Sequence, residues 1–132
     1  GDPSIYSTCW YVLRRVQARG YTTALVPGVP SFCAAAAALG RALCEDDESL
    51  HILPASHGGL EEALDLPGSR VLMKAGRSIG AVRDALAARG ELAQAALVER
   101  CGMAGERIVT DLATLDDSTG YFATILVKED RT

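Results

Sequence analysis

The feature that most constrains the fold of this chain is an apolar segment that passes through a Pro-Gly turn into a run of alanines. Residues 23–26 are mainly apolar, the turn dipeptide occupies 27–28, and five alanines stand at 34–38. The order predicts a β-strand, a tight turn and a helix that begins at Pro30 or Ser31, with the Ser31 hydroxyl as cap. A strand that leads at once into a helix is typical of α/β folds.

The same segment has a second interpretation as a ligand-binding edge. The first turn of a helix exposes unpaired N–H groups and a partial positive charge, which bind a carboxylate or a phosphate. Gly28 would let a ligand approach the backbone closely. An ordinary strand-to-helix connection explains the same residues, and the spacing alone does not separate the two.

Length and charge exclude several classes of protein. The chain has 132 residues, 48% of them hydrophobic, and a formal net charge of −4. These values predict one globular domain with a real core, or two small halves, and they give no electrostatic support for a nucleic-acid partner. No apolar run approaches the roughly 18–20 residues that cross a bilayer, so no membrane association is expected.

The cysteines and histidines predict little reactive machinery. Four cysteines lack Cys-x-x-Cys spacing, which predicts buried free thiols in a reducing cytoplasm. They are Cys9, Cys33, Cys44 and Cys101. His51 falls within an expected strand and is interpreted as structural. His57, in a loop beside two glycines, is the better candidate of the two for a ligand contact, although a plain loop residue is the more common case. No metal site is expected.

The periodicity predicts alternating helices and strands. A first helix over residues 5–19, a strand at 21–26 and the alanine helix to about Leu43 precede an acidic, solvated linker at 45–48. Strands are then expected at 50–55, 70–75, 95–99, 107–112 and 122–128. Helices are expected at 59–66 and 78–89. The pattern predicts a mainly parallel sheet whose antiparallel edge is formed by the last two strands.

Three pieces of this pattern converge on strand ends and suggest a site. Asp2, in a Gly-Asp-Pro turn, is either a helix-entry residue or an acceptor for an amino or hydroxyl group of a ligand. Met73, at the end of its strand, is either core filler or a ligand contact. The Pro-Gly-Val-Pro-Ser turn at 27–31 is the third. No Walker or Gly-x-Gly-x-x-Gly pattern occurs, and Ser, His and carboxylate residues do not gather into a hydrolase signature, so the chemistry would use bound reagents in place of a protein nucleophile.

These motifs resemble the tetrapyrrole methylase family. The resemblance rests on five segments in the family's order: Gly-Asp-Pro-Ser-Ile-Tyr-Ser-Thr at 1–8, Val-Pro-Gly-Val-Pro-Ser-Phe at 26–32, Ile-Leu-Pro-Ala at 52–55, Val-Leu-Met-Lys at 71–74 and Tyr-Phe-Ala-Thr at 121–124. The first two segments are most similar to the branch that methylates C20 of precorrin-2 or cobalt-precorrin-2 in cobalamin biosynthesis.

The resemblance implies a fold and a partition of the chain. Family members have two α/β domains, bind S-adenosylmethionine in the cleft between them and usually form homodimers. Residues 1–45 would be the end of the N-terminal domain, and residues 46–132 the C-terminal domain. The family's first strand, with its Gly-x-Gly-Pro-Gly-type loop, has no counterpart in this sequence.

The resemblance also implies a cofactor site and a reaction. Asp2 would lie near the polar end of S-adenosylmethionine, and Ile5 would contact it through the backbone. Pro30 and Ser31 would face its methionine part, and Met73 would pack on it. The positions near the adenine would be Ala96, Phe122 and Ala123. The product would be S-adenosylhomocysteine and a tetrapyrrole methylated at C20.

Two alternatives stay open. The chain could belong to a family member that methylates another ring position or a protein. The isolated piece could instead be a non-catalytic module for cofactor binding or dimerisation. The sequence assigns neither the base nor the metal state of the substrate.

Overall fold

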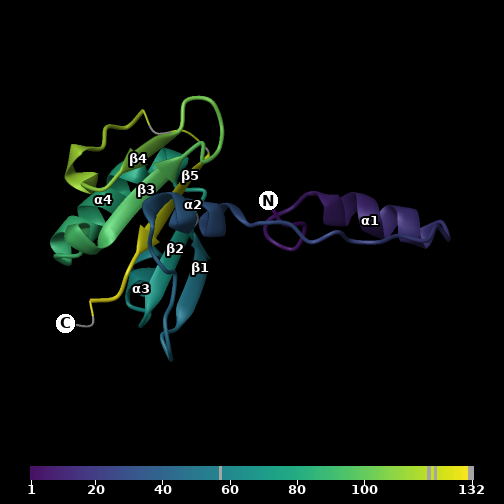
Figure 1. Cartoon of the computed structure of the whole chain (residues 1–132), viewed down its shortest axis with the longest axis horizontal. Helices are drawn as coiled ribbons and strands as arrows, with labels where there is room; N and C mark the ends of the chain where they lie inside the picture. Colours follow the sequence, from purple (N-terminus) through teal and green to yellow (C-terminus); the bar gives the residue numbers. More distant parts are fainter. Residues whose placement is uncertain (57, 119, 121, 131–132) are drawn as a thin grey trace.

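The chain forms an α/β body from which an N-terminal arm projects (Figure 1). The structure is a computed structural model and describes residues 1–56, 58–118, 120 and 122–130. We call residues 1–30 the arm and the described residues from 31 onward the body. The two regions differ in how much apolar surface they bury.

The body is built on one five-stranded sheet with the order β1-β2-β5-β3-β4. The strands are β1 (Leu50–Pro54), β2 (Ser69–Met73), β3 (Ala95–Glu99), β4 (Arg107–Val109) and β5 (Ala123–Val127). β1 and β2 are parallel, whereas β5 is antiparallel to both β2 and β3, and β4 is antiparallel to β3.

The α/β class is confirmed, but the prediction of a mainly parallel sheet was wrong. One of the four strand pairs is parallel, and the last strand lies at the centre instead of pairing with β4 at an edge. All five residues of β5 are buried. A strand that is buried on both faces lies between two neighbouring strands and two covering layers. The alternation of strands and helices along the sequence does not reveal this position.

Helices cover both faces of the sheet. α3 (Leu60–Leu64) and α4 (Ile79–Ala88) pack on one face with Leu72, Leu97 and Ile125. α2 (Ser31–Leu39) packs on the other face, where Phe32 and its alanines meet the side chains of alternate strand positions. These are Val71, Val98 and Leu126. The alternation of side chains along each strand therefore divides the core into two layers.

α2 is shorter than predicted and is capped differently. It ends at Leu39, where Gly40 N–H and Arg41 N–H donate to the last carbonyls, and not near Leu43. Pro30 occupies the N-cap position, and no side chain caps the helix. Ser31 is therefore the first helical residue, and the predicted Ser31 cap was wrong.

In the arm, α1 (Cys9–Ala18) is followed by an extended segment that runs back along it (Figure 1). The strand predicted at 21–26 is extended but pairs with no strand within the described residues. α1 buries no residue. The helix also starts later than the apolar spacing predicts, because residues 2–6 form turns.

The acidic stretch at 45–48 is less solvated than predicted. The Glu48 carboxylate accepts from Ser69 Oγ at 2.9 Å and pairs with Lys128 Nζ. The hydrogen bond from Lys128 is the main cause that lowers the pKa of Glu48. The division into domains at residue 45 stays a prediction; α2, from the first segment, packs on the sheet of the second.

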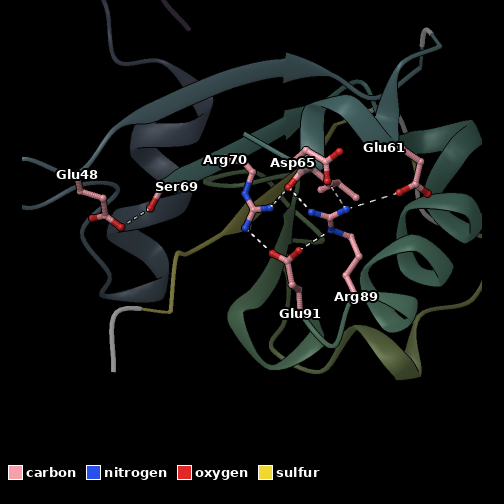
Figure 2. Close-up of polar contacts among 8 residues, drawn as sticks. Glu48, Glu61, Asp65, Ser69, Arg70, Arg89 and Glu91 are labelled. Carbon is pink, nitrogen blue, oxygen red and sulfur yellow. Dashed lines mark hydrogen bonds and ion pairs between the residues drawn. The ribbon is translucent and has the colours of Figure 1, made fainter. Parts of the chain in front are cut away.

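An ion-pair network joins β2 to the end of α4 (Figure 2). Glu91 accepts from Arg70 Nη2 and, at 2.7 Å, from Arg89 Nε. Arg89 also donates to Asp65 at 2.7 Å and to Leu64 O at 2.8 Å. Arg70 is the second residue of β2, so the network lies at the end of this strand opposite to Met73.

The remaining expectations have mixed outcomes. All four cysteines are free, but Cys33 and Cys44 are exposed and Cys9 and Cys101 are only partly buried, so the prediction of buried thiols was wrong. In the part of the chain that the structure describes, no helix is long and apolar enough to cross a membrane, and no cluster of His, Cys, Asp and Glu could hold a metal ion. His57 lies outside the described residues.

Candidate functional site

A cleft of about 540 Å³ lies where β2 and β3 end and β5 begins. Its described lining comes from the arm, the start of α2 and this sheet edge, and comprises Gly1, Ile5, Tyr6, Val29, Ser31, Ala34, Met73, Lys74, Val98, Arg100, Cys101, Met103, Phe122, Ala123 and Thr124. Segments that are far apart in the sequence therefore share one concave surface.

The strand directions explain why these residues meet. β5 is antiparallel to its two neighbours, so its first residues lie beside their last residues. Thr124 is opposite both Met73 and Val98, and Ala123 is opposite Glu99. The pairing continues one step further, because Arg100 N–H donates to Phe122 O at 3.1 Å.

On the arm side, Asp2 ties the Gly-Asp-Pro turn to the Pro-Gly turn. Its Oδ2 accepts from Gly28 N–H at 2.9 Å, and its Oδ1 accepts from Ser4 N–H at 2.8 Å. These bonds, the Gly28 bond first, hold the pKa of Asp2 below its ordinary value. A Cβ on Gly28 would lie 2.4 Å from Gly1 O, so the space at this glycine is taken by the chain itself and not by a ligand.

Five of the eight residues that the sequence assigned to a cofactor line this cleft. They are Ile5, Ser31, Met73, Phe122 and Ala123. Pro30 stands between two lining residues as the N-cap of α2. Asp2 lines a neighbouring groove that shares Gly1, Ile5 and Tyr6 with the cleft.

Ala96 is the assigned residue that the structure keeps away from the cleft. It is fully buried as the second residue of β3, opposite Leu126 and three residues before the end of that strand. Tyr121, which belongs to one of the quoted motifs, lies outside the described residues.

Among the polar lining residues that the sequence interpretation missed are Tyr6, Lys74 and Arg100. Lys74 and Arg100 directly follow β2 and β3, so the rule that strand ends face a ligand crevice could have found them. Lys74 Nζ lies 4.5 Å from the centroid of the Tyr6 ring, which is a cation–π distance. All three have left-handed backbones, with φ of 49°, 57° and 52° respectively.

The cleft offers binding surface more than reactive groups. No Asp, Glu or His occurs among its described lining residues. Burial first, and then the nearby Glu106 carboxylate, raise the pKa of Cys101, which keeps it a thiol at neutral pH. The arrangement can therefore orient a bound molecule, and it holds no activated nucleophile within the described residues.

The chain matches the family of Tetrapyrrole (Corrin/Porphyrin) Methylases over residues 1–116. It is 37% identical to the cobalamin biosynthesis protein CobIJ of Mycobacterium tuberculosis over 93% of its own length and 24% of the relative's. It is 31% identical to the precorrin-2 C(20)-methyltransferase of a Sinorhizobium species over 96% of its length and 52% of the relative's. The chain thus spans between a quarter and about half of these relatives.

Solved structures show the same fold. A cobalt precorrin-4 methyltransferase, CbiF, superposes with a TM-score of 0.81 at 23% identity, over 97% of this chain and 61% of that one. The uroporphyrin-III C-methyltransferase of Thermus thermophilus, in complex with S-adenosylhomocysteine, gives 0.69 at 19% identity, over 98% and 63%. With a family match over most of its length, the chain belongs to the tetrapyrrole methylase family.

Proposed function

We propose that this chain supplies part of the cofactor cleft of an S-adenosylmethionine-dependent methyltransferase that acts at C20 of precorrin-2 or its cobalt form. The observation that carries the proposal is the gathering of Ile5, Ser31, Met73, Phe122 and Ala123 on one cleft. The similarity to a C20-methyltransferase over 96% of the chain supports the choice of ring position.

The residues of the cleft fit the parts of this cofactor. The Phe122 side chain is 60% exposed at the cleft, so it offers an aromatic surface on which an adenine can stack. The first turn of α2, at Ser31, offers backbone N–H groups that suit a carboxylate. The flexible side chain of Met73 packs readily against an irregular apolar surface.

The cofactor, when bound, supplies a methyl group activated by a sulfonium. The chain's own contribution is to position the two reactants and to exclude water. Apolar side chains of Ile5, Met73 and Ala123 line the cleft and displace water from it. Positioning of this kind lowers the barrier of a direct displacement without an acid or a metal.

Calorimetric titration of S-adenosylhomocysteine into the chain tests the cofactor part. We expect saturable binding that Met73→Ala weakens about tenfold, because a packed contact is lost. Asp2→Ala should weaken it as well, because the two turns that carry Ile5 and Ser31 lose their link. Asp84→Ala, on the exposed side of α4, is the matched control and should leave affinity unchanged.

A wild-type chain that does not bind S-adenosylhomocysteine, or that binds it equally well after both changes, would contradict the cofactor assignment. The position of methylation is tested separately with isotopically labelled S-adenosylmethionine and precorrin-2, in a protein of the relatives' full length that contains this chain. Label at C20 supports the proposal. Label at another ring carbon assigns the chain to a different branch of the family.

A further inference from the structure

Two cations in the cleft lack the carboxylate partners that most cations of the sheet and its helices have. Lys74 and Arg100 line the cleft, and within the described residues neither makes an ion pair. Five other cations of the body are paired, namely Arg70, Arg83, Arg89, Arg107 and Lys128, whereas Arg41 and Arg77, unpaired within the described residues, lie outside the cleft lining. In a chain of net charge −4, two unpaired cations on a surface without described acidic lining form a local anion-attracting site.

The backbone at these residues is held in an unfavourable conformation. Lys74 and Arg100 have φ of 57° and 52°, in the left-handed region that residues with a Cβ seldom adopt. Both come directly after a buried strand, so the turn that ends the strand directs the next residue to the cleft edge. Strained residues of this kind concentrate at binding sites, where a particular side-chain placement is needed.

Tyr6 holds one of the two cations in place. Its ring centroid lies 4.5 Å from Lys74 Nζ, and Tyr6 also has a positive φ of 49°. The arm therefore restrains an ammonium that the sheet supplies. The contact leaves the three donors of the ammonium without an oxygen acceptor among the described residues, so they remain able to bind one.

We propose that Lys74 and Arg100 form a subsite for the side-chain carboxylates of a tetrapyrrole, with Tyr6 as the positioning residue for Lys74. This inference rests on the proposed function and adds to it the group that recognises the substrate. Two cations from different strands suit a molecule with carboxylates around its rim. The single carboxylate of the cofactor is the other possible source of the same chemistry, and the test separates the two.

The test compares the affinity of uroporphyrin, an octacarboxylate porphyrin, by quenching of its fluorescence, with that of S-adenosylhomocysteine by calorimetry. We expect Lys74→Met and Arg100→Met each to raise the Kd for uroporphyrin about tenfold, since each removes a charge-assisted contact. Neither should change the Kd for S-adenosylhomocysteine more than twofold. Arg77→Met is the matched control, because Arg77 is exposed, unpaired within the described residues and outside the cleft lining.

A second set of variants separates binding from a purely structural role, for which replacement of Lys74 or Arg100 would lower Tm. Lys74→Gly and Arg100→Gly relieve the left-handed backbone, so we expect Tm to be equal or higher while uroporphyrin affinity falls. For Tyr6, Tyr6→Leu should weaken uroporphyrin about threefold, and Tyr6→Phe, which keeps the ring, should restore it.

The outcomes that overturn the inference differ from those that overturn the proposed function. Unchanged uroporphyrin affinity in the Lys74→Met, Arg100→Met double variant, or no uroporphyrin binding by a wild type that binds S-adenosylhomocysteine, removes the subsite and leaves the cofactor cleft. If the Lys74→Met and Arg100→Met variants bind S-adenosylhomocysteine more weakly but uroporphyrin unchanged, the two cations belong to the cofactor site, and the subsite is also overturned. A wild type that binds neither molecule removes both proposals.

Discussion

Two helices of equal length, α1 in the arm and α4 in the body, have opposite environments. Each has 10 residues, but α4 buries Ile79, Val82, Ala85 and Leu86, whereas α1 buries none. In the arm, Tyr11 remains 70% exposed and Val26 80% exposed. A helical pattern of apolar residues thus marks a face that can be buried, and burial itself needs a partner surface.

The difference also concerns what holds each region together. The body has a core on both faces of its sheet. The arm depends on local polar contacts, such as Trp10 Nε1 donating to Pro3 O at 2.7 Å and Gln17 Nε2 donating to Thr23 Oγ1 at 2.8 Å. Helices of this length are marginal by themselves in water. We therefore expect mutations in the body to change global stability and equivalent mutations in the arm to act locally.

The largest contrast should come from one substitution made in both helices. Leu86 is fully buried in α4, so Leu86→Ala should lower the free energy of unfolding by about 3–4 kcal/mol through lost burial and a cavity. Leu13 is only partly buried in α1, so Leu13→Ala should lower the free energy of unfolding by less than about 1 kcal/mol. Urea denaturation followed by circular dichroism measures both. Equal losses would show that arm and body unfold as one unit.

The ion-pair network gives the next largest effect. Glu91→Ala leaves the buried Arg70 guanidinium without its carboxylate, which should cost about 3 kcal/mol, near the low end for a broken buried pair because the Glu91 side chain is 20% exposed. Asp84→Ala removes an exposed partner of Arg83 and should cost less than about 0.5 kcal/mol. The same denaturation assay compares them. A Glu91 variant as stable as the Asp84 variant would contradict the pairing in Figure 2.

Two equally crowded glycines, one in the body and one in the arm, allow a third comparison of the two regions. A Cβ would lie 2.3 Å from Ser49 O at Gly68, in the body, and 2.4 Å from Gly1 O at Gly28, in the arm. Gly68 also has a φ of 83°, so Gly68→Ala should lower the free energy of global unfolding by about 2 kcal/mol. Gly28→Ala should leave the global unfolding midpoint unchanged and weaken S-adenosylhomocysteine binding, because the Asp2 link is lost. A global loss at Gly28 would mean that the arm is part of the cooperative unit.

The sequence predicted the helices and strands of the body well and the strand order poorly. The strands expected at 50–55, 70–75 and 95–99 correspond to β1, β2 and β3 within a residue or two. Local periodicity contains this information. The insertion of β5 between β2 and β3 depends on long-range pairing, which leaves no local mark except the continuous burial of its residues.

The sequence predicted residues of the cleft lining best where a motif and a strand or helix end coincide, and their role in cofactor binding stays a prediction. Met73, at the end of β2, and Ser31, at the start of α2, were expected and line the cleft. Ala96 was assigned from the family resemblance alone and is buried in β3. Lys74 and Arg100 were missed because a single basic residue after a strand has no periodicity, and only the fold shows that the two share a surface without acidic partners.

The smallest difference between arm and body should appear in the dependence of stability on acid pH. The pKa of Glu48 is lowered chiefly by the hydrogen bond from Lys128. Burial alone would raise the pKa of Glu91, but hydrogen bonds from Arg70 and Arg89 outweigh it and hold that pKa below its ordinary value. A carboxyl whose pKa is lower in the folded state stabilises the fold above its unfolded pKa, and this contribution is lost as the pH falls through the folded value.

Thermal unfolding between pH 7 and pH 3 measures this loss. We expect Tm to fall below about pH 4.5, where an unfolded glutamate begins to bind protons. Glu48→Gln should lower Tm at pH 7 and flatten its decline at acid pH. Asp2 also has a lowered pKa, through its bond from Gly28 N–H, but it lies in the arm. Asp2→Asn should therefore leave the pH profile of Tm unchanged, and a flattened profile in this variant would place the turn at Asp2 within the cooperative fold of the body.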